Sequence, residues 1–248
     1  MNNFRPIQLR SPNFNQRPKG SVIDMLVLHY TGMVSAGSAL NDLCDSSKKV
    51  SAHYLVDEGG KCFQLVDEAN RAWHAGESSW AGNSDVNSYS IGIELANPGH
   101  EFGYKPFPET QMRSLETLLR TILSRHSIPA HKILGHSDVA PSRKQDPGEL
   151  FDWQRLATND IGLWPNQKHD QISMEGNLLK FGMNGTAVRD LQKQLSYFGY
   201  NIEITGHYDL KMKEVVIAFQ RHYRSQQING VFDSLCLELL LDLLNQIE

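Results

Sequence analysis

The stretch VIDMLVLH, residues 22–29, decides the fold of the first part of this 248-residue chain. Its run of apolar and β-branched side chains is typical of a buried strand, and the turn signal Thr31-Gly32 follows it. We therefore expect a strand with His29 at its end. In an α/β sheet, side chains that act together gather at such strand ends and in the loops beyond them.

Three further segments predict strands of the same sheet. AHYLV (52–56) and CFQLV (62–66) are separated by DEGGK (57–61), whose glycines predict a hairpin turn. SIGIEL (90–95) is another strand, which ends at the turn signal NPG.

An amphipathic helix is predicted after these strands, from PETQ to LSRH (108–126), and Pro129 lies just past its end. Strands interleaved with such a helix predict an α/β fold with a central mixed β-sheet flanked by helices. The apolar face of the helix consists of Met112, Leu115, Leu118, Leu119, Ile122 and Leu123.

The chain changes character near residue 165. We assign residues 1–165 to the α/β domain, whose core spans about 20–165, and the polar, aperiodic residues 166–175 to a linker. Residues 176–248 predict a small all-α bundle of three helices. Because the first domain carries its own strands and helix, a chain truncated in the linker is expected to fold alone.

The second and third helices of the bundle are each preceded by a similar phrase, GHYD (206–209) and GVFD (230–233). In each phrase we expect the aspartate to cap the helix N-terminus and the aromatic residue to pack beneath it. The expected helical faces are Val188, Leu191, Leu195 and Phe198; Met212, Val215, Val216 and Phe219; and Leu237, Leu240, Leu241 and Leu244.

Composition excludes several classes of protein. The net charge of −4 gives no reason to expect a nucleic-acid partner. Cys44, Cys62 and Cys236 lack the paired spacing of a thiolate metal site, so we expect free thiols. No stretch approaches the roughly 20 apolar residues of a membrane span.

The basic residues near the start lead only to the short segment 22–29, which Asp24 interrupts. A signal peptide ending there would be cleaved at or beyond His29 and would remove a candidate site residue. We therefore expect a cytoplasmic protein, with the periplasm or secretion by a non-classical route as the alternative. We also expect a monomer.

The stretch GHSDVAPSRKQDPG (135–148) carries candidate metal ligands. Pro141 and Pro147 predict a rigid loop too broken for a helix. Its His136 and Asp146, together with His29, offer two imidazoles and one carboxylate, which suit a tetrahedral Zn²⁺ with one position open to water. A helical HEXXH signature is absent, so spacing alone leaves the alternative of structural histidines open.

These motifs together resemble a known family. LHYTG around His29, IGIELANPG around Glu94 and the stretch 135–148 are similar to the type-2 N-acetylmuramoyl-L-alanine amidases, zinc enzymes related in fold to peptidoglycan recognition proteins. SAHYLVDEGG and RAWHAG match too, and the resemblance covers about residues 20–165. It implies one Zn²⁺ per chain held by His29, His136 and Asp146, and a catalytic acid/base pair formed by Glu94 and Lys144.

The resemblance implies hydrolysis of the amide between N-acetylmuramic acid, or its 1,6-anhydro form, and L-alanine of the peptidoglycan stem peptide, in cell-wall degradation or recycling. Glu94 can take a proton from water, and the Lys144 ammonium can offset charge on the oxyanion. The partner is then peptidoglycan or a soluble muropeptide. The alternatives are a recognition protein that binds muropeptides without cleaving them and an adaptor that docks onto the wall.

Further residues are expected to contact substrate. RAWHAG places Trp73 where it could stack on a sugar and His74 where it could hydrogen-bond peptide or glycan, and Asn97 could read a peptide amide. His53 lies in a strand and faces either the cleft or the core.

Residues 176–245 resemble the peptidoglycan-binding type-1 domain of wall hydrolases, through LLKFGMNGTAVRDLQKQLSYFGY and the two aspartate phrases. The resemblance implies attachment to the wall polymer. A module that only stabilises the first domain is the alternative.

Overall fold

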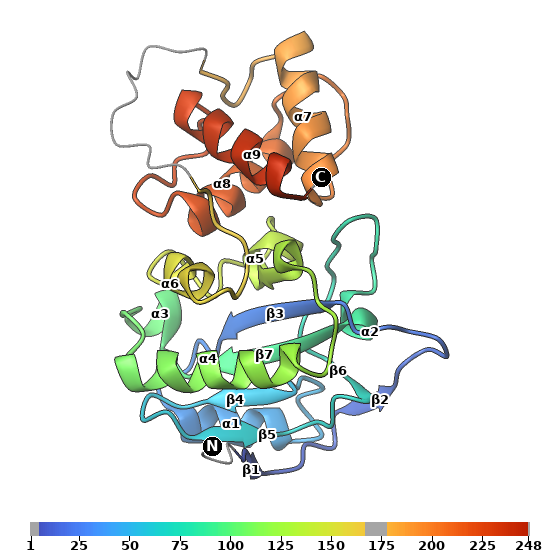
Figure 1. Ribbon diagram of the computed structural model, residues 1–248, viewed down its shortest axis with the longest axis vertical. Coiled ribbons are helices and arrows are strands. Elements are labelled where there is room, and N and C mark those ends of the chain that lie inside the picture. Colours follow the sequence, from blue (N-terminus) through green and yellow to red (C-terminus); the bar gives the residue numbers. More distant parts are fainter. Residues whose placement is uncertain (1–4, 167–177, 248) are drawn as a thin grey trace.

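The computed structural model describes residues 5–166 and 178–247, and it confirms a mixed α/β part followed by a helical bundle (Figure 1). The α/β part is built around a six-stranded sheet of order β1-β5-β4-β7-β3-β8, next to a two-stranded sheet of β2 and β6. The strands are β1 (Ile7–Gln8), β2 (Phe14–Gln16), β3 (Met25–Tyr30), β4 (Tyr54–Val56), β5 (Cys62–Gln64), β6 (Asn70–Ala72), β7 (Ser90–Leu95) and β8 (Ile133–Gly135).

Six α-helices lie in the described part of this domain, with a 3-10 turn over Ala130–Lys132. They are α1 (Ala36–Cys44), α2 (Val86–Tyr89), α3 (Gly99–Phe102), α4 (Glu109–Leu123), α5 (His136–Val139) and α6 (Trp153–Thr158).

The predicted hairpin, the fourth predicted strand and the predicted helix are confirmed. Strands β4 and β5 pair antiparallel, with Tyr54 opposite Gln64. Strand β7 spans the predicted SIGIEL segment and runs parallel to β3. Helix α4 buries its predicted face except for Leu123, which stays partly exposed.

Strand β3 begins later than predicted, at Met25 instead of Val22. The side chain of Val22 is 68% exposed. Asp24 forms an ion pair with Lys132, the last residue of the 3-10 turn before β8, so these residues lead into the sheet without being buried in it. The strand continues through Tyr30, which leaves His29 as its penultimate residue.

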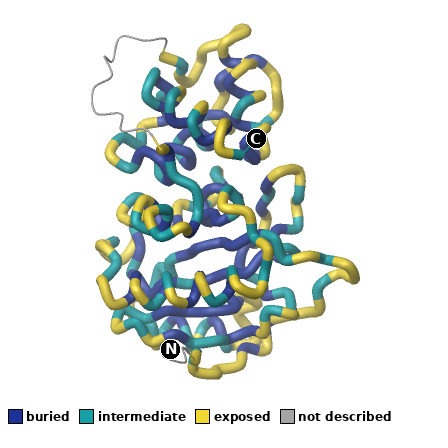
Figure 2. Tube along the Cα trace, viewed as in Figure 1, coloured by how far each residue is buried: buried dark blue, intermediate teal, exposed yellow. Residues whose placement is uncertain are grey.

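Alternation along β3 assigns the two faces of the sheet. Leu26 and Leu28 belong to the cluster that α4 and α6 cover. Met25 and Val27 face the other side, where they join a cluster with the helical bundle. His29 shares the face of Met25 and Val27, and α1 packs on Leu55 and Leu65 beside it. Figure 2 shows the central strands buried between these layers.

Helix α5 is a correction to the expected helix-free loop over residues 135–148. His136–Val139 form one helical turn, and Pro141 lies beyond its end, where its missing N–H costs no helical hydrogen bond. The carboxylate of Asp138 accepts the Gly135 N–H at 2.7 Å, which stabilises this turn.

The bundle contains α7 (Thr186–Phe198), α8 (Leu210–Tyr223) and α9 (Ser234–Ile247). Both predicted caps are present, because Asp209 accepts the Met212 N–H and Asp233 accepts the Cys236 N–H. Tyr208 and Phe232 are buried as expected. The predicted face of α9 is partly wrong: Leu237 and Leu241 are about 40% exposed, while the buried face consists of Cys236, Leu239, Leu240, Leu243 and Leu244.

The bundle packs directly on the α/β part. The buried carboxylate of Asp138 in α5 lies 2.7 Å from His222 Nδ1 in α8 and accepts the hydroxyl of Tyr200 at 2.9 Å. The His222 ring stacks on Trp153, with centroids 3.8 Å apart. Trp80, from the loop before α2, is buried against Tyr200. One hydrophobic cluster therefore runs from the sheet into the bundle.

The expected linker falls, apart from Asn166, outside the described residues. All three cysteines are free thiols, as predicted. Across residues 5–166 and 178–247, every helix is too short or too polar to cross a bilayer.

Candidate metal centre and active site

Three elements bring the predicted metal ligands together. Pairing of β3 with β7 places His29 opposite Glu94. Pairing of β3 with β8 brings the start of α5, and with it His136, to the same edge of the sheet. The loop after α5 returns to its first turn, where the Ser137 N–H donates to the Asp146 carbonyl at 2.9 Å.

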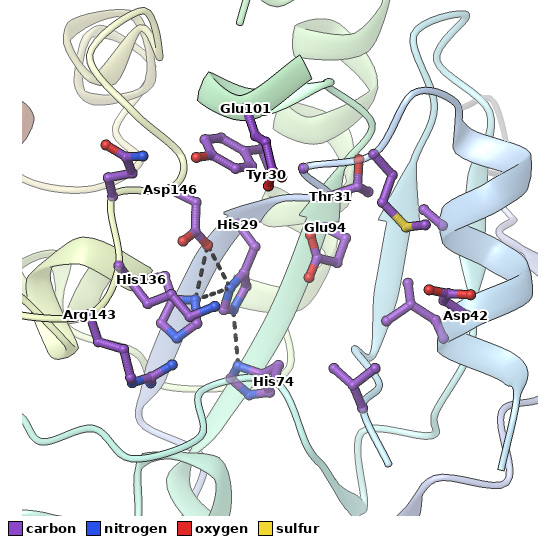
Figure 3. A pocket seen from close by; sticks show the side chains of 17 residues that line it. His29, Tyr30, Thr31, Asp42, His74, Glu94, Glu101, His136, Arg143 and Asp146 are labelled. Atoms are coloured by element: carbon purple, nitrogen blue, oxygen red, sulfur yellow. Dashed lines mark hydrogen bonds and ion pairs between the residues drawn. The ribbon is translucent and has the colours of Figure 1, made fainter. Parts of the chain in front are cut away.

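The three ligand atoms converge on one point. His29 Nδ1 lies 2.9 Å from His136 Nδ1 and 3.1 Å from Asp146 Oδ2, and His136 Nδ1 lies 3.0 Å from that same oxygen (Figure 3). Ligands about 2.0–2.1 Å from a tetrahedral zinc ion are themselves about 3.3 Å apart. All three residues are buried, and they are the metal-capable group found in the described part of the chain. The arrangement therefore fits a zinc ion with little movement.

The Nε2 atom of each imidazole, on the side away from the three ligand atoms, also has a partner. His136 Nε2 donates to the backbone carbonyl of Ala75 at 3.0 Å, because a carbonyl oxygen can only accept. His29 Nε2 lies 3.1 Å from Nδ1 of His74. Such outer contacts orient metal-binding histidines.

Electrostatics favours the ionisation states that bind a metal. Burial, with the neighbouring His136, lowers the pKa of His29 to about 4, so its imidazole is neutral at pH 7. Burial opposes ionisation of Asp146, but His136 and His29 outweigh it and hold the pKa of that carboxyl well below its usual range. A neutral imidazole and a carboxylate are the forms that ligate zinc.

Glu94 differs from Asp146 in its surroundings. Its Oε2 atom is buried and has no hydrogen-bond partner among the described residues. Burial, reinforced by the Asp146 charge, raises the pKa of Glu94 well above its usual range. A raised carboxyl pKa is typical of a group that exchanges protons during catalysis.

Lys144 lines the same cavity, partly exposed, and no ion pair holds its ammonium within the described residues. The cavity has a volume of about 520 Å³ and lies between α1 and the loop after α5. Its walls include apolar residues of α1 and the following loop, Ala39, Leu43 and Val50, opposite the ligands. A pocket of this size suits part of a muropeptide.

The structure does not bring Trp73 and Asn97 into this cavity. Trp73 Nε1 donates to Asn15 of β2 at 2.7 Å, on the side of the small sheet. Asn97 is buried, and its amide donates to the Lys105 carbonyl at 2.7 Å while its oxygen accepts the Gly99 N–H. Both side chains therefore have structural partners in place of substrate.

His53 and His74 are both buried. His53 Nδ1 accepts the Gly92 N–H at 3.0 Å, and its Nε2 lies 3.1 Å from the Asn70 carbonyl, so its polar atoms serve the sheet. His74 reaches the base of the cavity, but its ring contacts His29 and Ser90.

Sequence reasoning missed several lining residues. Tyr30, Glu101 and Arg143 also line the cavity (Figure 3). Arg143 Nη2 donates to the carbonyls of Ala75 and Glu77, both at 2.7 Å. Its place next to Lys144 in the quoted loop was the available signal, whereas nothing local marks Glu101.

Two family models match the chain. The model described as N-acetylmuramoyl-L-alanine amidase matches residues 19–149, more than half of the chain. The model described as a putative peptidoglycan binding domain matches residues 184–240.

Curated relatives and solved structures agree with these matches. The N-acetylmuramoyl-L-alanine amidase AmiD of Escherichia coli is 36% identical over 226 residues, which cover 86% of this chain and 79% of AmiD. The 1,6-anhydro-N-acetylmuramyl-L-alanine amidase AmpD of Haemophilus influenzae is 34% identical over 170 residues, 61% of this chain and 90% of AmpD.

Among solved structures, the complex of E. coli AmiD with the substrate anhydro-N-acetylmuramic acid-L-Ala-D-gamma-Glu-L-Lys has a TM-score of 0.77 at 33% identity, covering 93% of both chains. AmpDh3 from Pseudomonas aeruginosa in complex with anhydromuramic pentapeptide has a TM-score of 0.75 at 26% identity, covering 99% of this chain and 97% of that one.

Proposed function

The chain belongs to the N-acetylmuramoyl-L-alanine amidase family and is an enzyme, and from this premise we propose how its residues divide the work. The substrate bond is the amide between N-acetylmuramic acid and L-alanine of the stem peptide. The observation that carries the proposal is the convergence of His29, His136 and Asp146 at one end of the sheet, with Glu94 on the adjacent strand.

We assign one zinc ion to His29, His136 and Asp146, because two imidazoles and one buried carboxylate are ligands that zinc accepts. When bound, zinc supplies Lewis-acid chemistry: it makes water more acidic and polarises a carbonyl oxygen. These three residues also leave the cavity side of the centre open to substrate.

We assign proton transfer to Glu94 and stabilisation of the negatively charged oxygen to Lys144. Glu94 accepts a proton from the attacking water and delivers it to the nitrogen of L-alanine as the C–N bond breaks. Lys144 places its positive charge at the cavity, where negative charge develops on the former carbonyl oxygen. The products are a muramic carboxylate and a peptide with a free amino group.

The substrate class is muropeptide, and we propose that the 1,6-anhydro form is cleaved. Support comes from the two solved relatives above, whose bound molecules carry anhydromuramic acid. A recognition protein without catalysis would not need a carboxyl with a raised pKa at Glu94. An adaptor would need neither this group nor the ligand set.

The helical bundle is assigned to the wall polymer, as the matching binding-domain model supports. We further propose a monomer, since one chain supplies all five site residues, and light scattering during size-exclusion chromatography tests this. Three free thiols support a reducing compartment, the cytoplasm. Fractionation of cells that make the untagged chain tests the compartment.

Substitution of a metal ligand tests the proposed function. His136→Ala should lower zinc content, measured by elemental analysis, and should abolish release of the tripeptide from anhydromuramyl-tripeptide, measured by mass spectrometry. His53→Asn is a matched control, because His53 is equally buried but contacts no ligand atom. Full zinc content in His136→Ala would refute the ligand assignment.

The natural substrate is decided by assaying the same preparation on intact sacculi and on anhydromuramyl-tripeptide. Cleavage of the soluble molecule alone indicates recycling, and cleavage of both indicates that the bundle also presents polymer to the site. Chelator should stop both activities, and added Zn²⁺ should restore them.

A further inference from the structure

His74 is buried and lines the cavity, but it has no role in the reaction proposed above. It is 6% exposed, and its ring lies over β7 at Gly92. A Cβ atom at Gly92 would lie 2.3 Å from the ring, so the strand has a glycine where the ring must fit. The sequence therefore makes room for this histidine next to a metal ligand.

The hydrogen positions around His74 follow from its neighbours. Ser90 Oγ lies 2.6 Å from the Val86 carbonyl and 3.1 Å from His74 Nε2. A carbonyl oxygen can only accept, so the single hydroxyl hydrogen of Ser90 is directed to Val86. Ser90 must then accept a hydrogen bond from His74, which places the proton of the neutral His74 ring on Nε2.

This tautomer determines the next contact. With Nε2 protonated, His74 Nδ1 carries a lone pair, and the atom facing it at 3.1 Å is His29 Nε2. His29 must donate, so its own proton is on Nε2. Its Nδ1 is left with a lone pair, directed toward His136 and Asp146.

The next residue along the chain does the same for the other imidazole. The Ala75 carbonyl accepts from His136 Nε2, which leaves the lone pair of His136 on Nδ1. Both backbone N–H groups of this dipeptide, of His74 and Ala75, donate to Asn87 Oδ1, at 3.1 and 2.9 Å. Asn87 is buried, so the 74–75 segment is held at both its backbone and its side chain.

We propose that His74 and Ser90 are positioning residues that fix the Nε2–H tautomer of His29 and so direct its Nδ1 lone pair to the metal. The inference rests on the proposed zinc site. It replaces the expected substrate contact of His74 with a role in metal affinity. A histidine with the opposite tautomer would present an N–H to the ion and could not bind it.

His53 does not take part, although its ring centroid is 5.8 Å from that of His74. Its Nδ1 accepts from the Gly92 backbone, and its Nε2 faces the Asn70 carbonyl. Both nitrogens are thus engaged away from the ligands.

Zinc affinity tests the role of Ser90. Ser90→Ala should weaken zinc binding roughly 10- to 100-fold, measured by competition with a chromophoric chelator, since outer-shell contacts typically contribute this much. Ser88→Ala is the matched control: Ser88 is fully buried two residues earlier, but its hydroxyl contacts Asp85 and Arg71 and not His74. Circular dichroism and melting temperature verify that each variant is folded.

The outcomes separate this inference from the proposed function. If the unsubstituted chain binds no zinc, the proposed function fails. If it binds zinc and Ser90→Ala binds zinc equally well, the proposed function stands and the positioning role is overturned.

A second measurement needs no substitution. In the zinc-loaded protein labelled with ¹⁵N-histidine, long-range ¹H–¹⁵N correlation spectra report which ring nitrogen carries the proton. We expect His74 and His29 both to be protonated at Nε2 and unprotonated at Nδ1. A proton on Nδ1 of His74, or protons on both nitrogens, would overturn the inference.

Discussion

The two carboxylates of the site show how surroundings divide roles at the scale of single residues. Asp146 lies within 3.1 Å of two imidazoles and stays ionised. Glu94 instead has a raised pKa and a buried oxygen for which the described residues offer no hydrogen-bond partner. A group that is always ionised suits a ligand, and a group whose proton affinity is raised suits proton transfer.

Substitution of Glu94 should separate metal binding from proton transfer. Glu94→Gln keeps the size of the side chain but cannot accept a proton, so turnover of anhydromuramyl-tripeptide should fall roughly 10²-fold or more. Zinc content and melting temperature should stay close to those of the parent chain. Near-normal turnover would mean that another group acts as the base.

The raised pKa of Glu94 also sets a pH dependence. Glu94 must be deprotonated to accept a proton, whereas burial favours its protonated form. Turnover should therefore fall as the pH is lowered, and the fall should be centred at a pH above the ordinary glutamate pKa of about 4.3. The residual activity of Glu94→Gln should lack this limb. Zinc content is measured at each pH as a control. If zinc content stays constant, the loss of turnover at low pH is ascribed to Glu94. If turnover falls together with zinc content, the loss is due to protonation of the metal ligands.

Residue positions in this site could be predicted from the sequence to a limited degree. His29 and Glu94 lie near the ends of two apolar strands, and such strand ends meet at one edge of a parallel sheet. The partners of Trp73 and Asn97 could not be predicted, because Asn15 and the Lys105 carbonyl lie in segments whose approach depends on the whole fold. The contacts of His74 with His29 and Ser90 could not be predicted for the same reason.

At the scale of elements, strand β7 contributes to the site at three positions. One strand supplies Glu94, the Ser90 hydroxyl and the space over Gly92 that the His74 ring occupies. This strand could be predicted, because its residues and the turn signal NPG that ends it are local features of the sequence. The short helix α5 was not predicted, because a single turn leaves no periodicity and part of the contacts of Asp138 come from the bundle, far along the chain.

A methyl group at Gly92 should disturb this support. Gly92→Ala places a Cβ 2.3 Å from the buried His74 ring, which must move. Overpacking of this kind costs typically 1–3 kcal/mol in the free energy of unfolding. We expect a lower melting temperature and weaker zinc binding, measured by denaturation and by chelator competition.

Gly59→Ala is the control for that change, because among residues 5–166 and 178–247 the added atom meets only a side-chain oxygen of Asp57, at 3.4 Å. It should leave zinc binding unchanged. Normal zinc affinity in Gly92→Ala would show that the His74 ring moves without consequence for His29.

At the scale of the whole molecule, the bundle is joined to the catalytic part by more than a linker. Asp138 lies two residues after the proposed ligand His136, and its buried carboxylate finds partners in His222 and Tyr200 of the bundle. The polar linker composition predicted independent domains, but composition does not report the surfaces that pack against each other. These contacts oppose the expectation that the α/β domain folds normally alone.

Deletion of the bundle tests this coupling. A chain ending at Asn166 loses the residues that cover Trp80, Trp153 and Asp138, so we expect a lower melting temperature and reduced cleavage of both anhydromuramyl-tripeptide and sacculi.

In the full chain, His222→Leu leaves the bundle in place but removes a partner from a buried carboxylate, at a cost on the order of 3 kcal/mol. Like the truncation, this substitution should lower the melting temperature and the activity on both substrates. If the truncated chain instead keeps its melting temperature and its activity on the soluble substrate and loses only sacculi, the bundle acts as an anchor that raises local concentration at the polymer.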